Sequence, residues 1–400
     1  MKFFVFLFSN LIYPFSFIIP RSKKKWAFGS FRNAFNDNSK YLFIYVSENH
    51  PEIDAVWISA KKKTIEEINK LGLKAYYIGS FRGLLHALIS KYWFFNSYTS
   101  DILFFASGNA VCINLWHGVG LKKIEFCIKN GKLADRFVKK TIKERFFHPE
   151  AFRRPDYFLS STDFQSVKFA EAFRIKPAQC LNIGYPRNTI LISTEEERAS
   201  FINKYENKTT SDLINRTKSY KKTFVYMPTW RDSQQDIFST NINLRVLNDL
   251  MQENDSLLIL KPHANTKVDV KALSSYENII LLDNTIDIYT ILPYTDVLIT
   301  DYSSILYDYI LMEKKDVILY LYDMEEYIHE RDFNYPFMEN IVGKVVCNFE
   351  ELADCIKKND YEIDKIQKAE IRNKFWGNQI DIPVCERILE NTALKNNSQK

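Results

Sequence analysis

The chain has 400 residues, of which 46% are hydrophobic, so it is long enough for two domains of ordinary size with buried cores. Glycine and proline number only 11 and 12, which excludes a disordered or low-complexity chain. The formal net charge of +5 is mild for this length, and no aromatic RNA-binding signature accompanies the basic residues. We therefore expect no nucleic-acid partner.

The N-terminal segment, residues 1–25, combines an apolar stretch with a basic flank. No charged residue lies between Lys2 and Arg21, and this run is at the short edge of a membrane span. It carries no small-residue cleavage site of the kind that ends a signal peptide. An interfacial anchor, a marginal span and a buried element of the first domain all fit the pattern. We expect peripheral attachment to the cytoplasmic face of the membrane, with the basic cluster Arg21–Lys25 in the cytoplasm.

A second basic region lies between residues 122 and 145, where nine lysines and arginines accompany three acidic residues. This region suits an anionic membrane surface or a polyanionic acceptor, and it suits a solvated helical face equally well. The six cysteines form no C-x-x-C pair, and no histidine lies at metal-ligand spacing. They are typical of reduced, mostly buried thiols in a cytosolic protein, and we expect neither a protein-held metal nor a cofactor.

Short apolar runs alternate with helical patterns along the chain, which is typical of parallel sheets with helices on both faces. Residues 194–222 are polar, and we interpret them as the junction between two domains. The prediction is an α/β protein with two Rossmann-like domains facing across a cleft, over residues 26–200 and 220–390, followed by a polar tail over 391–400. The predicted strands are Trp26–Phe28, Ala55–Ile58, Ala75–Ile78, Trp93–Asn96, Val111–Leu115, Tyr157–Leu159, Leu181–Ile183, Phe224–Met227, Leu257–Leu260, Ile279–Leu281, Val297–Ile299 and Val317–Leu321.

Five of these strands end in residues suited to phosphate chemistry. Ligands of open parallel sheets bind outside the carboxyl ends of the strands, so residues at these ends are candidates for a site. The five strand ends are Trp116-His117-Gly118, Gly184-Tyr185-Pro186-Arg187-Asn188, Pro228-Thr229-Trp230-Arg231, Lys261-Pro262-His263 and Thr300-Asp301-Tyr302-Ser303-Ser304.

Each residue type has a physical reason to be in an anion site. Imidazole titrates near neutral pH, so His117 can act as a general base, and Gly118 lets the backbone approach a ligand closely. Arg231 offers a planar fork for phosphate oxygens. Ser303 suits a helix N-cap, and with Ser304 it supplies neutral donors at a helix start that favours anions.

Structural alternatives stand beside these assignments. A lone histidine at a strand end is often a satisfied structural residue, Arg231 could form a surface ion pair with Asp232, and residues 296–312 alone fit an ordinary capped helix. No P-loop and no G-x-G-x-x-G is present, which argues against nucleoside triphosphate or NAD binding by those routes. Because five strand ends coincide, we favour an anion pocket with one candidate base, an arrangement that serves phosphoryl transfer.

The motifs occur in the order seen in the CDP-glycerol:poly(glycerophosphate) glycerophosphotransferase family, which includes the teichoic acid and capsule polymerases and primases. The chain resembles this family over roughly residues 25–390. Phe28-Gly29-Ser30 followed by Asp37-Asn38-Ser39-Lys40 looks like the family's N-terminal motif, and Tyr322-Asp323 with Tyr327 looks like its downstream motif. The chain departs near Val342-Gly343, where the family often shows Pro-Gly, and near Asp381-Ile382, where it tends to have Asp-Gly; these departures concern contacts to the nucleotide or the donor tail.

The resemblance implies a GT-B architecture, a CDP-polyol donor that is usually CDP-glycerol, and a membrane-bound or lipid-linked acceptor. An acceptor hydroxyl would attack the glycerol-bearing phosphorus, and CMP would leave. By the same resemblance, His117 takes the role of base and His263 stabilises charge on the transferring phosphate. Asp301 would orient its loop or the nucleotide. The full set expected to bind the donor or its phosphates is Arg231, Lys261, Asp301, Ser303, Ser304, Thr229, Gly118 and Arg187.

The expected function is a CDP-glycerol glycerophosphotransferase that acts in teichoic-acid-like or capsular polymer synthesis, on a polyol-phosphate or lipid-linked glycan acceptor. A CDP-ribitol or other CDP-polyol phosphotransferase, a GT-B nucleotide-sugar glycosyltransferase and a non-enzymatic membrane-docked scaffold are the alternatives. The sequence leaves open the donor tail, the acceptor, priming as against polymerisation, and homo-oligomer formation.

Overall fold

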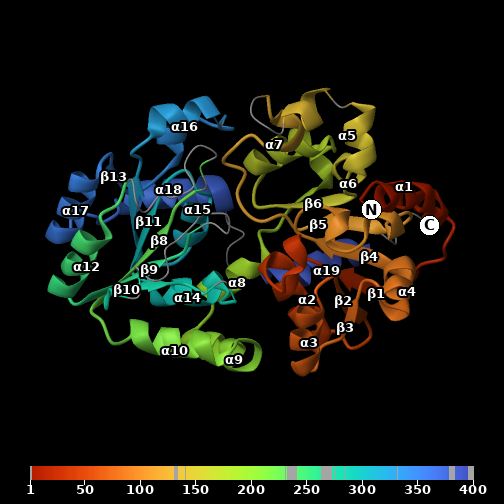
Figure 1. Ribbon diagram of the computed structural model, residues 1–400, viewed down its shortest axis with the longest axis horizontal. Helices are drawn as coiled ribbons and strands as arrows, with labels where there is room; N and C mark the ends of the chain where they lie inside the picture. Colours follow the sequence, from red (N-terminus) through yellow and green to blue (C-terminus); the bar gives the residue numbers. More distant parts are fainter. Residues whose placement is uncertain are drawn as a thin grey trace. The chain divides into compact units, whose positions relative to one another are not determined.

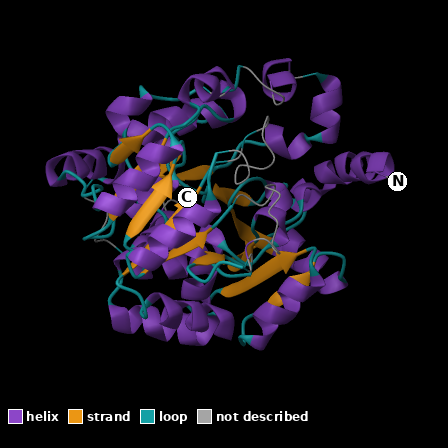
Figure 2. Cartoon of the chain, turned by 60° about the vertical axis from the view of Figure 1, so that its left-hand side comes forward, coloured by secondary structure: helices purple, strands orange, loops and turns teal. Residues whose placement is uncertain are grey.

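The computed structural model describes residues 2–129, 134–139, 141–229, 231, 241–262, 273, 275–283, 285–330, 332–377 and 383–394. By its contacts the chain divides into two compact units, one formed by Met1–Thr189 with Phe375–Lys400 and the other by Ile190–Lys374. Figure 1 labels the helices and strands of both units, and Figure 2 shows the strands of each sheet with helices packed around them.

The first unit contains a seven-stranded parallel sheet within the described residues. The strand order is β3-β2-β1-β4-β5-β6-β7, so the winding reverses between β1 and β4. In open parallel sheets this switch point is where ligands bind. The strands are β1 (Ser22–Phe28), β2 (Asp54–Ser59), β3 (Ala75–Tyr77), β4 (Ser90–Phe95), β5 (Val111–Asn114), β6 (Tyr157–Ser160) and β7 (Cys180–Asn182).

Helices cover both faces of the first sheet, which is why β2 and β4 are buried along nearly their whole length. Trp57 and Trp93 are fully buried at the centre of this unit. The α-helices of the unit are α1 (Lys2–Ile12), α2 (Asp37–Asn49), α3 (Lys62–Lys70), α4 (Phe81–Ile89), α5 (Ile142–Phe147), α6 (Pro149–Phe152), α7 (Asp163–Phe173) and α19 (Val384–Leu394).

The second unit contains a six-stranded parallel sheet within the described residues, in the order β10-β9-β8-β11-β12-β13. Its switch point lies between β8 and β11. The strands are β8 (Lys222–Met227), β9 (Ser256–Leu260), β10 (Ile279–Leu281), β11 (Val297–Thr300), β12 (Asp316–Tyr320) and β13 (Lys344–Val346). The helices are α9 (Glu195–Tyr205), α10 (Lys208–Thr217), α12 (Leu244–Glu253), α14 (Ile288–Ile291), α15 (Ile305–Tyr309), α16 (Met324–Glu330), α17 (Phe349–Lys358) and α18 (Lys365–Trp376), with the short α8 (Thr189–Ile192) at the start of the unit.

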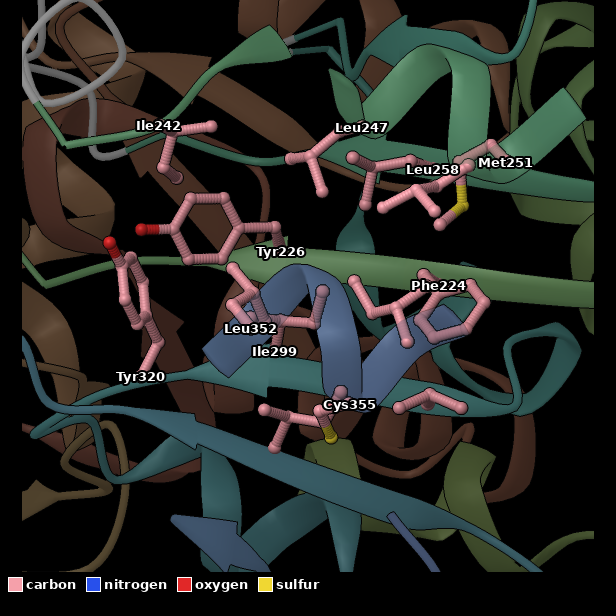
Figure 3. Packing of buried hydrophobic residues seen from close by; sticks show 14 of the residues in the cluster. Phe224, Tyr226, Ile242, Leu247, Met251, Leu258, Ile299, Tyr320, Leu352 and Cys355 are labelled. Carbon is pink, nitrogen blue, oxygen red and sulfur yellow. The ribbon is translucent and has the colours of Figure 1, made fainter. Parts of the chain in front are cut away.

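The core on one face of the second sheet is formed by alternate strand residues and two amphipathic helices (Figure 3). Phe224 and Tyr226 of β8 point to the same face because side chains alternate along a strand. Leu247 of α12 and Leu352 of α17 pack against them. Burial of apolar surface stabilises a fold by about 25 cal/mol per Å². The packing of these side chains is therefore the main favourable contribution to the stability of this unit.

The polar junction predicted over residues 194–222 is not an extended linker. The structure forms α9 and α10 there, both in the second unit. Thr194 and Glu197 form a capping box at the start of α9, and Ile202 and Tyr205 bury its inner face. The polar composition therefore belongs to the exposed faces of two amphipathic helices.

The C-terminal part of the chain also departs from the predicted ranges, since Phe375, Trp376 and α19 belong to the first unit. The ring of Phe375 lies 5.5 Å from that of Phe164, and Trp376 lies 5.7 Å from Tyr185. The first unit is therefore built from both ends of the chain.

The apolar N-terminal segment forms α1 and a 3-10 turn, Tyr13–Phe17, that pack on the first unit. Asn10 Nδ2 donates to Phe146 O at 3.1 Å, and the ring of Tyr13 stacks on Phe104 at 4.6 Å. Among the residues that the structure describes, no helix has both the length and the apolar character needed to cross a bilayer.

The basic cluster Arg21–Lys25 was expected to flank the membrane segment. In the structure β1 begins at Ser22, and the side chain of Arg21 is bonded within the first unit. Its guanidinium donates to the carbonyl oxygens of Ala87 at 3.0 Å, Ser90 at 2.7 Å and Gly108 at 2.8 Å. Burial lowers the pKa of Arg21 to about 10. Arg21 is therefore a structural residue that ties the N-terminal segment to the sheet.

Candidate active site

His117 follows β5 in the first unit, and its ring is held by a backbone carbonyl. The Nδ1 atom lies 3.1 Å from Asn96 O, at the end of β4. A carbonyl only accepts hydrogen bonds, so Nδ1 carries the proton and Nε2 keeps its lone pair. The residue is solvent-exposed, although the ring lies against Trp116 with 4.0 Å between centroids. Crowding by surrounding protein lowers the pKa of His117 below its ordinary value, and the carboxylate of Asp37 opposes that shift. The ring thus has the protonation and exposure that a general base needs.

The loop that carries His117 has a left-handed backbone, with φ of 52° at Trp116 and 133° at Gly118. Positive φ is strained for tryptophan and suits glycine, so the loop needs fixed contacts to hold it. Asn38 supplies two of them, since its Nδ2 donates to Trp116 O at 2.9 Å and to Leu115 O at 3.3 Å. Tyr185 donates to Gly118 O at 3.2 Å. Gly118 was expected to contact the donor. In the structure it has a conformational role, because its φ of 133° suits glycine.

Arg187 was expected to bind phosphate, but its side chain is buried and bonded to protein groups. Its Nη1 donates to Asp37 Oδ1 at 2.8 Å and its Nη2 to His117 O at 3.0 Å. Its backbone N–H donates to Asn38 Oδ1 at 3.1 Å. These contacts make Arg187 a residue that positions the His117 loop, because the guanidinium bridges the loop and the start of α2.

The second unit gathers the other candidates at the carboxyl edge of adjacent strands. β9, β8, β11 and β12 lie side by side, and each ends in a candidate residue or motif. Thr229 follows β8 and Asp301 follows β11, on the two sides of the switch point. The backbone N–H of Thr229 donates to both carboxylate oxygens of Asp301 at 3.0 Å, and the Thr229 hydroxyl also donates to it. Asp301 was expected to orient its own loop or the nucleotide, and these contacts tie it to the loop after β8.

Arg231 is 2% exposed and its guanidinium is occupied by protein groups. Nε donates to Asp323 Oδ2 at 2.6 Å, Nη1 to Thr229 O at 2.7 Å, and Nη2 lies 2.9 Å from Asp301 Oδ2. Burial alone would lower the pKa of Arg231, but Asp301 and Asp323 raise it above its ordinary value. This geometry differs from that of a direct diphosphate ligand and from a surface pair with Asp232, which lies outside the described residues. Arg231 instead locks the loops after β8, β11 and β12 together.

Ser303 and Ser304 are half-exposed at the end of β11, where their hydroxyls can reach a ligand. The expected cap is displaced by one residue, because the N-cap of α15 is Ser304, without a side-chain capping bond, and Ser303 Oγ accepts the N–H of Ile305 at 3.4 Å. The helix is only five residues long, so its dipole contributes little. The two hydroxyls, and not the helix, are therefore the candidates for binding an anion here.

Lys261 follows β9 and is half-buried. Burial lowers the pKa of its ammonium group, while Asp287 opposes the shift. Its backbone N–H donates to Tyr226 O at 2.9 Å, which anchors the residue to the edge of the sheet. The second candidate histidine, His263, lies outside the described residues.

Two further residues of the candidate site were not assigned a role from sequence. Asn96 ends the predicted strand Trp93–Asn96 and accepts the hydrogen bond from His117, and its place at a strand end is the signal that the sequence gives for it. Asp323 was seen only as part of a downstream motif. Within the described part of the chain, no cluster of three or more His, Cys, Asp or Glu side chains could hold a metal ion.

Comparison with known proteins identifies the family. Residues 11–393 match the family described as CDP-Glycerol:Poly(glycerophosphate) glycerophosphotransferase. The chain belongs to this family. The resemblance seen in the motifs is therefore confirmed, and the family is one of phosphotransferases.

Relatives within the family differ in the polyol that their names specify. The chain is 30% identical over 340 residues to a teichoic acid glycerol-phosphate transferase of Staphylococcus aureus, covering 82% of this chain and 81% of the relative. It is 26% identical over 351 residues to a teichoic acid poly(glycerol phosphate) polymerase of Staphylococcus epidermidis, covering 84% of this chain but 44% of the relative. A ribitol-phosphate polymerase of Staphylococcus aureus, TarL, is 30% identical over 258 residues, which is 64% of this chain and 43% of TarL.

The fold is similar to those of solved structures. The structure of the wall teichoic acid polymerase TagF matches with a TM-score of 0.74 at 24% identity, over 95% of this chain and 90% of the chain in that structure. A Staphylococcus aureus MnaA–UDP co-structure matches with a TM-score of 0.54 at 12% identity, over 93% of this chain and 97% of the chain in that structure. The two parallel-sheet α/β units thus form the GT-B-like fold that was predicted.

Proposed function

We propose that the chain is a CDP-glycerol glycerophosphotransferase of teichoic-acid-like polymer synthesis. In this proposal an acceptor hydroxyl attacks the phosphorus that bears glycerol, and His117 Nε2 takes the hydroxyl proton. The new P–O bond forms as the bond to the CMP oxygen breaks, so the products are the extended acceptor and CMP. The observation that carries the proposal is the contact between His117 Nδ1 and Asn96 O at 3.1 Å, which leaves Nε2 free to accept a proton.

The donor is assigned to the second unit. Ser303 and Ser304 supply hydroxyl donors after β11, and Lys261 supplies a cation after β9; these two strands flank β8 in the sheet. Arg231 and Asp301 act indirectly by fixing the loops that carry these groups. Phosphoryl transfer needs little from the protein beyond such positioning and charge stabilisation. His263 keeps the predicted role of stabilising charge on the transferring phosphate.

The experiment that tests the proposal measures CMP release from CDP-glycerol with a glycerophosphate-primed acceptor. We expect release by the wild type and a loss of at least about 100-fold for His117→Ala, because general base catalysis contributes that much. His86→Ala is the matched control, since His86 is a stacked histidine of the same unit, 4.9 Å from the ring of Tyr76. Equal release by His117→Ala and His86→Ala would remove His117 from the mechanism.

A second candidate function is the same reaction with CDP-ribitol, which the similarity to ribitol-phosphate polymerases favours. Parallel assays with CDP-glycerol, CDP-ribitol and a nucleotide sugar separate the alternatives. Turnover of the nucleotide sugar alone would favour the hypothesis that the chain is a glycosyltransferase. Calorimetry with CDP tests the hypothesis of a non-enzymatic scaffold, which predicts no heat of binding.

We further propose peripheral attachment to an anionic membrane through the N-terminal segment. Phe15 is 65% exposed and Ile18 is 79% exposed, and Ile142 on the neighbouring α5 is 88% exposed. Lys143 and Arg145 lie on the same short helix and could meet lipid headgroups. Co-sedimentation with phosphatidylglycerol vesicles should fall for Phe15→Ser with Ile18→Ser but not for Ile366→Ser, a 74% exposed residue of the second unit. Equal sedimentation of all variants would contradict this attachment.

A further inference from the structure

Asp101 is a buried carboxylate linked to His117 through the backbone of Asn96 and Ser97, and the reaction described above does not use it. It ends the 3-10 turn Thr99–Asp101 after β4 and is only 5% exposed. Its Oδ2 accepts the backbone N–H of Ser97 at 2.8 Å and of Asn96 at 3.2 Å. Burial raises the pKa of Asp101 to about 7, with the backbone N–H groups acting against the shift and Asp37 adding to it. Burial of a carboxylate costs free energy, so we looked to its contacts for a function that offsets this cost.

The peptide that Asp101 holds is the one that contacts His117. The carbonyl of Asn96 and the N–H of Ser97 form one planar peptide group: the carbonyl accepts from His117 Nδ1 at 3.1 Å, and the N–H donates to Asp101 at 2.8 Å. The Asn96 side chain is fixed as well, since Nδ2 donates to Ser30 Oγ at 2.8 Å and Oδ1 accepts from Ser39 N at 3.1 Å. The backbone and the side chain of Asn96 are therefore both fixed, and of the three partners Asp101, Ser30 and Ser39 it is Asp101 that binds the backbone.

The Asp101 turn has little freedom to move, because it packs against the end of β1. A Cβ atom added to Gly29 would lie 2.3 Å from Asp101 O, a distance that backbone atoms do not allow. Gly29 N also donates to Phe94 O at 3.1 Å, which holds β1 beside β4. The sheet thus fixes the backbone of Asp101, and Asp101 in turn fixes the peptide of Asn96.

We propose that Asp101 is a positioning residue for His117, which orients the Asn96 carbonyl so that the imidazole keeps its proton on Nδ1 and presents Nε2 as the base. This inference rests on the proposed function of His117 as a general base. Asp101 itself touches no substrate in this account. An ordering carboxylate of this kind acts through hydrogen bonds to the backbone, so its removal should alter the tautomer of His117 before it alters donor binding.

The test combines imidazole ¹⁵N NMR of histidine-labelled protein with steady-state kinetics. The His117 resonances are assigned by their loss in His117→Gln. In Asp101→Asn we expect a larger fraction of the Nε2-protonated tautomer, a fall in kcat on the order of tenfold and an unchanged KM for the CDP-polyol. Asp156→Asn is the matched control, because Asp156 likewise accepts a backbone N–H, that of Cys112 at 2.8 Å, but at the amino end of β5. The control should leave the His117 tautomer unchanged.

Two results would overturn the inference: an unchanged His117 tautomer in folded Asp101→Asn, or a tautomer change that Asp156→Asn reproduces. If Asp101→Asn does not fold, Asp101→Ser keeps a smaller acceptor and should shift the tautomer in the same direction. The NMR measurement needs no substrate, so it separates the two proposals. Absence of CMP release by the wild type would refute the proposed function, whereas the tautomer measurement would still decide whether Asp101 positions His117.

Discussion

Arg187 donates to the carbonyl oxygen of His117 at 3.0 Å, and through its other terminal nitrogen it donates to Asp37 at 2.8 Å. The two partners come from motifs that are far apart in the sequence, one after β5 and one at the start of α2. A planar guanidinium can serve both at once, whereas an ammonium group cannot match this geometry. The ion pair is largely buried, so screening by solvent weakens it little.

Arg187→Lys should therefore lower kcat without raising the KM for the CDP-polyol. The lysine keeps one contact and loses the other, so the His117 loop relaxes, and a displacement on the order of 1 Å can cost about 100-fold in rate. Steady-state measurement of CMP release checks this. Arg153→Lys is the control, since Arg153 binds the carbonyl groups of Ser107 and Ala110 and does not contact His117. A change confined to KM would show that Arg187 contacts the donor directly.

The acidic limb of the pH–rate profile should report His117. A general base acts when it is neutral, so kcat/KM should rise with pH as His117 loses its proton. Because the pKa of His117 is lowered, the midpoint of this rise should lie below the ordinary histidine value of about 6.5. Asp37 raises that pKa, so Asp37→Asn should move the midpoint to lower pH. Asp54→Asn, which alters an ion pair with Lys25 at the amino end of the sheet, should leave the midpoint in place. A midpoint that moves to higher pH in Asp37→Asn would contradict the assignment.

Much of the fold could be predicted because each strand is a short apolar run bounded by polar residues. β5 and β11, for example, were predicted within one residue of their observed ends. The residue that holds His117 was missed, since an asparagine at a strand end carries no chemical signal by itself. The role of Arg231 could not be predicted because its partner Asp323 lies 92 residues away and burial is not visible in the sequence. Local patterns in the sequence therefore predict the strands, whereas polar contacts between residues far apart in the sequence cannot be predicted from them.

Arg231→Met should destabilise the second unit. The substitution leaves the carboxylates of Asp301 and Asp323 buried without their cation, and breaking a buried pair in this way costs about 3–5 kcal/mol. Urea unfolding followed by intrinsic fluorescence measures the loss. Arg231→Met combined with Asp323→Asn should recover part of it, because one unpaired charge is removed. Arg216→Met, at an exposed arginine, should change the free energy of unfolding by less than about 0.5 kcal/mol.

Replacing both serines after β11, Ser303→Ala with Ser304→Ala, should weaken binding of the donor diphosphate and leave the fold intact. Both side chains are half-exposed, and the cap of α15 uses no side-chain bond from Ser304, so little structure depends on them. Each lost hydrogen bond to a charged group is worth about 1.5–3 kcal/mol, so the Kd for CDP should rise at least about 10-fold. Calorimetry with CDP and with cytidine separates the diphosphate contact from the nucleoside contact. Equal weakening for both ligands would mean that the serines support the nucleoside pocket, and an unchanged Kd for CDP would place the diphosphate elsewhere.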